Sequence, residues 1–200
     1  MSGTMERIEN ASQAGCLCPA WLAGFLDLRL RARLHDPDAI LGPYVRPGRT
    51  VVDLGCGPGF FSVALARLVG PGGSVVAVDL QPRMLARARR NAVAAGTAER
   101  ILFRRCGPDD LGVTGPVDFV LAFWMLHEVP DPARLLRQVR AVLDPAGRFL
   151  LVEPKLHVRA ARFRAALAAT EAAGFVQLEE PPVALSRAAL FSCGPLDRVP

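Results

Sequence analysis

Residues 51 to 61, VVDLGCGPGFF, place a carboxylate and three closely spaced glycines directly after an apolar run. Glycine lets the backbone approach a ligand closely and adopt positive φ angles, and the start of a following helix presents free N–H groups. The spacing G-x-G-x-G differs from the G-x-G-x-x-G that binds a pyrophosphate. Asp53 precedes the first glycine by two residues, and its charge would repel a pyrophosphate but attract an ammonium group.

A second carboxylate, Asp79, ends the next apolar run, 20 residues beyond Gly59. A carboxylate in this position after a second strand can accept hydrogen bonds from both hydroxyls of a ribose. A ligand with a ribose and an amino-acid ammonium group, but without phosphate, corresponds to S-adenosylmethionine. The glycine spacing and Asp53 argue against the competing interpretation, a nicotinamide-dependent dehydrogenase.

The glycine loop, Asp53 and Asp79 can bind one ligand only if strands and helices hold them at the same edge of a sheet. Apolar runs that alternate with helix-like segments predict a parallel sheet covered by helices on both faces. The closing strands, 175–180 and 184–191, have a link too short for a helical crossover and predict an antiparallel hairpin. The expected fold class is α/β, a Rossmann-like, doubly wound, seven-stranded sheet, mostly parallel, with one antiparallel strand in a C-terminal hairpin. The remaining strands are expected at 50–55, 74–80, 100–106, 117–123 and 147–153, and the helices at 60–70, 82–96, 131–143 and 158–173.

The segment before the sheet differs in character. Residues 1–40 are expected to form a flexible stretch and a helix over 20–34 that could act as a lid, and residues 41–200 to form one domain. There is no long, uncharged apolar run to indicate a membrane span. The polar N-terminus lacks the apolar core of a signal peptide, which indicates a cytoplasmic protein. Cys16 and Cys18 lack a second ligand pair at zinc-site spacing, so no metal site is predicted.

The net charge of +5 raises the question of a nucleic-acid partner. Only one of the 24 basic residues is lysine, and alanine, glycine, proline and arginine are all abundant. This pattern is typical of a GC-rich coding sequence, and we favour that compositional explanation over nucleic-acid binding. Arg83, Arg87 and Arg90 share one helical face, which is interpreted as solvated, with RNA contact as the less favoured alternative.

Three motifs, VVDLGCGPGFF, VVAVDLQPRML and VDFVLAFWMLHEVPD, closely resemble those of the class I S-adenosylmethionine-dependent methyltransferases. The resemblance is greatest to the type 11 group, which includes the ubiquinone and menaquinone methyltransferases and many small-molecule enzymes. It covers roughly residues 40–193 and implies that residues 41–200 are a methyltransferase domain. The implied cofactor is S-adenosylmethionine.

The resemblance also implies roles for residues around the cofactor. The glycine loop and Asp53 would hold the methionine part, and Asp79 would hold the ribose. In the third-strand loop, Gly107 stands where the family often has aspartate, so either Asp109 or Asp110 substitutes, or the side-chain contact is missing. The full set of implied cofactor-binding residues is Asp53, Gly55, Cys56, Gly57, Gly59, Asp79, Leu80, Met84, Gly107, Pro108, Asp109 and Phe123, with Trp124 also beside the sulfonium.

Candidate residues for the reaction itself follow the fourth and fifth strands. His127 and Glu153 are the predicted catalytic residues, because a base is needed wherever the acceptor must lose a proton. Each has a structural alternative. His127 could bond a backbone group, and Glu153 could pair with Lys155, which would point to the same side of an extended chain. Glu128 and His157 are interpreted as solvated residues.

The favoured function is methyl transfer to a small-molecule acceptor by in-line displacement. Trp21, Phe25 and Tyr44 could line an apolar acceptor pocket, or could pack on the flank of the sheet. An RNA methyltransferase is the first alternative, and the sequence AFWM after the fourth strand, in place of an NPPY-like motif, argues against a flipped base. The second alternative is a non-catalytic S-adenosylmethionine-binding subunit that needs another protein for turnover.

Overall fold

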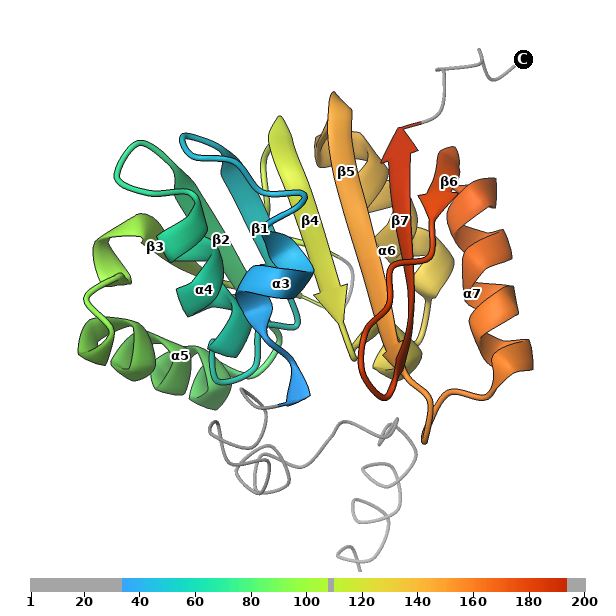
Figure 1. Ribbon diagram of the computed structural model, residues 1–200, viewed down its shortest axis with the longest axis horizontal. Coiled ribbons are helices and arrows are strands. Elements are labelled where there is room, and N and C mark those ends of the chain that lie inside the picture. Colours follow the sequence, from blue (N-terminus) through green and yellow to red (C-terminus); the bar gives the residue numbers. More distant parts are fainter. Residues whose placement is uncertain (1–33, 108–109, 194–200) are drawn as a thin grey trace, which may run out of the picture.

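A computed structural model describes residues 34–107 and 110–193, which form a sheet flanked by helices (Figure 1). The strands are β1 (Thr50–Leu54), β2 (Ser74–Asp79), β3 (Ile101–Arg105), β4 (Val117–Phe123), β5 (Leu143–Pro154), β6 (Phe175–Glu179) and β7 (Ser186–Cys193). The α-helices are α3 (Pro37–Leu41), α4 (Phe60–Leu68), α5 (Pro82–Ala94), α6 (Pro132–Val142) and α7 (Ala160–Ala172). Two 3₁₀ turns complete the elements, η2 (Ala98–Arg100) and η3 (Leu126–Glu128).

The strand order is β3-β2-β1-β4-β5-β7-β6, which confirms the predicted seven-stranded, doubly wound sheet. Strands β1 to β5 pair in parallel, and β7 runs antiparallel to both β5 and β6. The order reverses between β1 and β4. In sheets of this kind, ligands bind beyond the carboxyl ends of the strands at such a reversal. The loops after β1, β2, β4 and β5 therefore meet at the edge where a ligand is expected.

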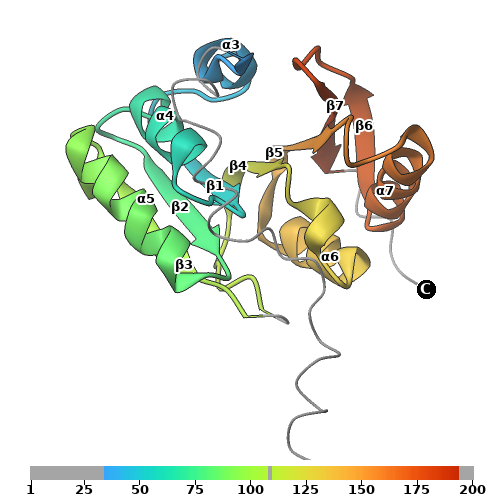
Figure 2. The ribbon, with the colours of Figure 1, turned by 90° about the horizontal axis from the view of Figure 1, so that it is seen from below.

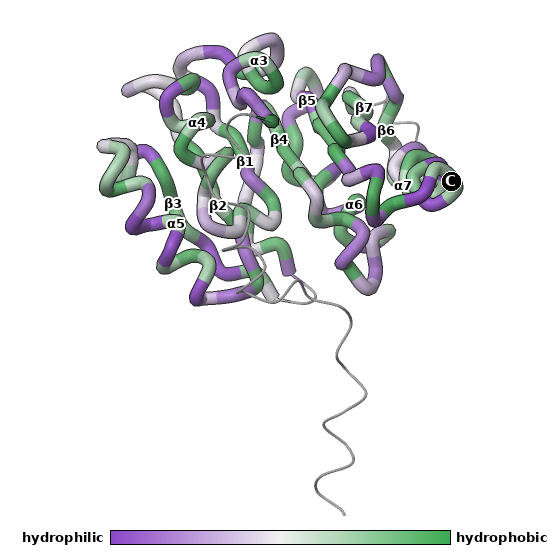
Figure 3. Tube along the Cα trace, turned by 60° about the horizontal axis from the view of Figure 1, so that its bottom comes forward, coloured by the Kyte–Doolittle hydropathy of each residue, from purple (hydrophilic) through white to green (hydrophobic). Residues whose placement is uncertain are grey.

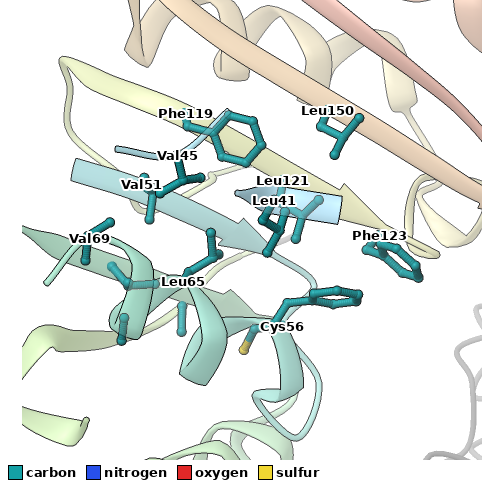
Figure 4. Close-up of a cluster of buried hydrophobic side chains, with 14 of the residues drawn as sticks. Leu41, Val45, Val51, Cys56, Leu65, Val69, Phe119, Leu121, Phe123 and Leu150 are labelled. Atoms are coloured by element: carbon teal, nitrogen blue, oxygen red, sulfur yellow. The ribbon is translucent and has the colours of Figure 1, made fainter. Parts of the chain in front are cut away.

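The helices divide between the two faces of the sheet. Seen along the strands, α3, α4 and α5 cover one face, and α6 and α7 cover the other (Figure 2). Two buried apolar clusters correspond to these two layers. Figure 4 shows the first cluster, in which Leu41 of α3, Leu65 of α4 and Phe119 of β4 point toward one another. Much of β4 is hydrophobic, whereas α5 carries both hydrophilic and hydrophobic residues (Figure 3).

Three phenylalanines anchor the second cluster on the antiparallel side of the sheet. Phe149, Phe175 and Phe191 come from β5, β6 and β7, and their ring centroids lie 5.4 to 6.2 Å apart. Phe191 is fully buried, with an exposed fraction of 0%. This aromatic contact ties the hairpin to the rest of the sheet.

A Phe191→Ala variant should therefore lower the free energy of unfolding by about 3–5 kcal/mol, because it leaves a cavity as well as losing apolar burial. Urea unfolding followed by circular dichroism measures this loss. Leu102→Ala serves as the control, since Leu102 is 52% exposed on the edge strand β3. Equal stability losses in the two variants would contradict the assignment of Phe191 to the core.

One strand departs from the sequence-based expectation. β5 begins at Leu143, directly after α6, instead of at residue 147. The added residues of β5 include Pro145, and the pairing of β4 with β5 shifts its register between Val117 and Phe119. Such an irregularity admits a proline near the start of a strand.

The predicted helix over 20–34 falls almost entirely outside the described residues, as do Cys16 and Cys18. Among the residues that are described, no helix has both the length and the apolar character needed to cross a bilayer.

Candidate active site

The three glycines after β1 all have positive φ angles, and each is required for a different reason. An added Cβ at Gly55 would lie 2.8 Å from the Met125 Cβ, and one at Gly59 would lie 2.8 Å from the Ala88 Cβ. Both of these glycines therefore permit close packing. A Cβ at Gly57 would meet no atom within 4 Å. Gly57 is the glycine of this loop that borders open space, so a ligand cradled by the loop would lie against it.

Asp79 connects the end of β2 to this loop. Its Oδ2 accepts a hydrogen bond from the Gly57 N–H at 2.9 Å, and its Oδ1 accepts one from the Gln81 N–H at 2.8 Å. The residue is 8% exposed. Burial raises the pKa of the Asp79 carboxyl above its ordinary value, and the two N–H groups partly oppose that rise. Each oxygen keeps a further lone pair, so the carboxylate can still accept from a ribose.

Asp53 is buried at 2% exposure, and its Oδ2 accepts a hydrogen bond from the Ser62 hydroxyl at 2.5 Å. Ser62 lies in the first turn of α4, so this bond fixes the start of the helix relative to β1. Sequence reasoning did not single out Ser62. The available signal was a polar residue within the apolar helix FFSVALARL, three positions after the last glycine.

The other predicted cofactor-binding residues vary in exposure. Cys56 and Met84 are buried, Leu80 is half-buried and Gly107 is exposed. Pro108 and Asp109 lie outside the described residues. Burial, followed by the charges of Asp53 and Asp79, raises the pKa of the Cys56 thiol far above its ordinary range. Cys56 therefore packs in the loop as a neutral thiol.

Aromatic rings gather where β4 ends. Phe123 is buried, and its ring centroid lies 4.3 Å from that of Phe61. Trp124 has a φ of +59°, which is rare for a bulky residue and is found where the surroundings impose it. Its Nε1–H donates to the Ser186 hydroxyl at 2.9 Å. The buried His35 ring lies nearly perpendicular to the rings of Phe123 and Trp124, with centroids 5.2 and 5.0 Å away. His35 and Ser186 are functional candidates that the sequence did not reveal.

His127 and Glu153, the predicted catalytic pair, are in direct contact. The His127 Nδ1 lies 2.5 Å from the Glu153 Oε2, and the His127 backbone N–H donates to Oε1 at 3.3 Å. Glu153 is 1% exposed, and the His127 side chain is 16% exposed. Because a carboxylate accepts, Nδ1 carries the proton of the neutral imidazole and Nε2 is left with its lone pair. A carboxylate that orients an imidazole in this way equips it to act as a general base.

Further contacts hold this histidine in place. The guanidinium of Arg162, on α7, donates to the His127 carbonyl at 2.7 Å. The His157 ring lies parallel to the imidazole with centroids 6.4 Å apart. Glu128 Oε1 is 3.9 Å from the His127 Nε2. The His127 backbone is thus held through its carbonyl and its N–H, and the imidazole is held through Nδ1, whereas Nε2 has the longer contact with Glu128.

The structure decides between the alternatives that the sequence left open for Glu153 and for Tyr44, which packs on the flank of the sheet. Glu153 does not pair with Lys155, because the neighbouring strand's loop supplies His127 as its partner and Lys155 is exposed. Tyr44 does not line a site at the carboxyl ends of the strands. Its ring stacks on Phe119 near the start of β4, with centroids 6.3 Å apart, and its hydroxyl donates to Glu179. Trp21 and Phe25, the other proposed lining residues, lie outside the described residues.

A sheet of this order, with a glycine loop after β1 and a carboxylate ending β2, defines the class I S-adenosylmethionine-dependent methyltransferases. A family model described as "Methyltransferase domain" matches residues 46–179, and the chain belongs to that family. S-adenosylmethionine is the cofactor of this class, and the carboxylate of Asp79 and the open space at Gly57 fit it.

Similar proteins agree with this assignment. The chain is 39% identical over 103 residues to an arsenite methyltransferase of Halobacterium salinarum, covering 51% of this chain and 26% of the relative. It is 35% identical over 121 residues to a ubiquinone biosynthesis O-methyltransferase of Xanthomonas axonopodis, covering 60% and 47%. The matched part therefore spans less than half of either relative. The fold is similar to that of a methyltransferase from Aquifex aeolicus, with a TM-score of 0.78, 22% identity, and coverage of 87% of this chain and 98% of that one.

Asp79→Ala should weaken S-adenosylmethionine binding by about 1–3 kcal/mol, because the ribose hydroxyls lose their acceptor. The variant also releases the Gly57 N–H, which Asp79 now holds. Isothermal titration calorimetry measures the dissociation constant. Asp118→Ala is the matched control, since Asp118 bonds Arg49 and Thr50 at the opposite edge of the sheet. Unchanged affinity in Asp79→Ala would refute the ribose assignment.

The pH dependence of binding supplies a second readout. The ribose hydroxyls would donate to the ionised carboxylate, and burial raises the pKa of the Asp79 carboxyl in the free protein. The affinity for S-adenosylmethionine should therefore be highest above that raised pKa and should decline as the pH falls through it. Asp79→Asn, which cannot titrate, should lose this decline.

Proposed function

We propose that this chain transfers the methyl group of S-adenosylmethionine to a small-molecule acceptor by in-line displacement. His127, oriented by Glu153, would take the acceptor's proton through Nε2. The contact of 2.5 Å between the imidazole and the buried carboxylate is the observation that carries this proposal. Carboxylates and histidines that meet this closely beside a ligand loop are typical of proton-transfer sites.

Met125 links the proposed catalytic residues to the cofactor loop. Met125, which fills the space beside Gly55, lies two residues before His127. The base would therefore stand next to the loop that holds the methyl donor. The cofactor supplies an activated methyl group, so the protein needs chiefly to align the acceptor and exclude water. Asp79 and the loop N–H groups would bind the donor, and the aromatic wall of Phe123 and Trp124 would exclude water.

The named relatives support a small acceptor. The arsenite and ubiquinone-biosynthesis methyltransferases, to judge from their names, act on an inorganic ion and on a quinone precursor. The rings of Phe61, Phe123 and Trp124 cluster at the end of β4. An apolar wall of this kind suits a small or lipophilic acceptor.

One observation favours RNA as a second candidate acceptor. Arg83, Arg89 and Arg90 are exposed along α5, and the Arg89 guanidinium lies 4.7 Å from the centroid of the Phe103 ring. A basic face with an aromatic residue is a feature of nucleic-acid surfaces. We rank it second because the aromatic residues after β4 favour a small or lipophilic acceptor over a flipped base.

The test is to incubate the purified protein with methyl-labelled S-adenosylmethionine and a cell extract, and to count label in metabolites and in macromolecules. Label in the metabolite fraction is the expected result, and it provides a compound to identify. Label in RNA would replace the small-molecule proposal with the second candidate. Binding of S-adenosylmethionine without any labelled product would instead indicate a subunit that needs a partner.

A further inference from the structure

Trp124 follows β4, and its two chain neighbours contact the glycine loop and the helix after it. Phe123 packs against Phe61, in the first turn of α4, with ring centroids 4.3 Å apart. On the other side, the Met125 Cβ would lie 2.8 Å from a Cβ added at Gly55. The Trp124 backbone is therefore placed beside the loop that is expected to hold the methyl donor.

The Trp124 side chain reaches from β4 to β7. Its backbone has a φ of +59°, a conformation that persists in a bulky residue only where the surrounding contacts hold it. The indole Nε1–H donates to the hydroxyl of Ser186, the first residue of β7, at 2.9 Å. Because β5 lies between β4 and β7, this bond spans β5 (Figure 1). Ser186 pairs with Pro154, the last residue of β5, so the indole crosses that strand near its carboxyl end.

The hydroxyl that receives the indole is itself oriented by a backbone carbonyl. The Ser186 hydroxyl donates to the Ala184 carbonyl at 3.0 Å, which leaves its lone pairs to accept from Trp124. The His35 Nε2 lies 3.0 Å from the same carbonyl and must carry the proton, because a carbonyl only accepts. Ser186 and His35 are 4% and 1% exposed. The direction of the Ser186 hydroxyl is thus set by buried partners.

Aromatic rings confine the indole as well. The His35 ring is nearly perpendicular to it, with centroids 5.0 Å apart, and the Phe123 ring is 5.5 Å away. Contacts from the segment before α3, from the end of β4 and from the start of β7 therefore meet at one side chain. A rotation of the Trp124 indole would break its bond to Ser186, so this bond selects one orientation of the ring.

We propose that Ser186 is a positioning residue for methyl transfer, and that it acts by holding the Trp124 indole as a fixed wall of the acceptor site. The inference rests on the proposed function, since the wall belongs to the same site. His127 follows Trp124 by three residues, so the wall and the proposed base come from the same connection after β4. A fixed wall keeps the acceptor in line with the methyl group and keeps water out.

The first test measures the motion of the indole and needs no acceptor. The chain has two tryptophans, so Trp124 is the only one in a Trp21→Phe background. In that background, Ser186→Ala should lower the fluorescence anisotropy of Trp124, and Ser186→Thr, which keeps the hydroxyl, should restore it. Ser74→Ala is the matched control, because it removes a hydroxyl that bonds Thr50 at the opposite edge of the sheet. Unchanged anisotropy in Ser186→Ala would overturn the inference.

The second test measures methyl transfer to the acceptor identified from extract. Ser186→Ala should lower kcat/KM for the acceptor about tenfold, because a misplaced wall misaligns the acceptor. Its dissociation constant for S-adenosylmethionine should stay within about twofold, and Ser186→Thr should recover the parent rate. Trp124→Phe keeps a ring but lacks the N–H donor. If Ser186 acts through the indole, adding Ser186→Ala to Trp124→Phe should cause little further loss. Fully additive losses would contradict the inference.

Failure of the inference and failure of the proposed function give different results. A labelled small molecule whose kcat/KM is the same in Ser186→Ala as in the parent protein would defeat the inference alone. Binding of S-adenosylmethionine without any labelled product would defeat the proposed function, and the inference with it, even if the anisotropy falls. A fall in anisotropy together with a loss of kcat/KM that threonine restores would support both.

Discussion

A Gly57→Val variant is expected to lose S-adenosylmethionine binding by more than about 100-fold, or about 2.7 kcal/mol, while the domain remains folded. The side chain would project from the loop into the space that borders no protein atom within 4 Å. A ligand that lies against the loop backbone would then collide with it. Calorimetric titration of the variant with S-adenosylmethionine measures the loss, and circular dichroism reports whether the sheet is intact.

The control must separate this collision from backbone strain. Valine at a positive φ costs about 1–2 kcal/mol of stability wherever it stands. Gly96, after α5, has a φ of +67° and also has no neighbour within 4 Å of an added Cβ. Gly96→Val should therefore lose similar stability but keep its affinity for the cofactor. Normal binding by Gly57→Val would show that the ligand does not lie against this glycine.

A His127→Ala variant is expected to transfer methyl groups about 10²- to 10⁴-fold more slowly than the parent protein, the range typical of a lost general base. Its affinity for S-adenosylmethionine should stay within about twofold, because the imidazole takes part in proton transfer and not in donor binding. The rate is measured with labelled cofactor and the acceptor identified from extract.

Two further variants test whether a loss of rate in His127→Ala comes from the imidazole that Glu153 orients. Glu153→Gln keeps the shape of the side chain but removes the charge that orients the His127 imidazole, so an intermediate loss is expected. His157→Ala removes the ring stacked 6.4 Å from that imidazole and should retain nearly the parent rate. Full activity in His127→Ala would make the histidine a structural residue and would point to an acceptor that needs no base.

The sheet was predictable because the residue pattern within each short segment indicates whether that segment forms a strand or a helix. β1, β2 and β4 are mainly apolar runs, and α6 carries its apolar residues on one face, so the alternation of strands and helices could be read directly from the sequence. The short link before β7 was enough to predict the antiparallel strand. The start of β5 was not predictable, because a register shift at Val117 allows the strand to include Pro145.

The role of an individual site residue depends on contacts with residues that are distant in the sequence. The sequence showed three similar glycines, but Met125 and Ala88 decide which of them face protein, and both are far away in the chain. Likewise, a Glu153–Lys155 pair was one alternative, because residues two apart in an extended strand point to the same side. The true partner, His127, comes from the neighbouring strand's loop, where only the sheet order could place it.

The position of β7 has a consequence for how the chain acquires its fold. β7 lies between β5 and β6, although it is synthesised after both. Until residues 186–193 have left the ribosome, β5 and β6 each have an unpaired edge, and unpaired edges favour pairing with other chains. The same residues include Ser186, whose hydroxyl accepts the hydrogen bond from the Trp124 indole at the end of β4. A nascent chain therefore completes its paired sheet and this contact in one late step, and a truncation before β7 would lose both together.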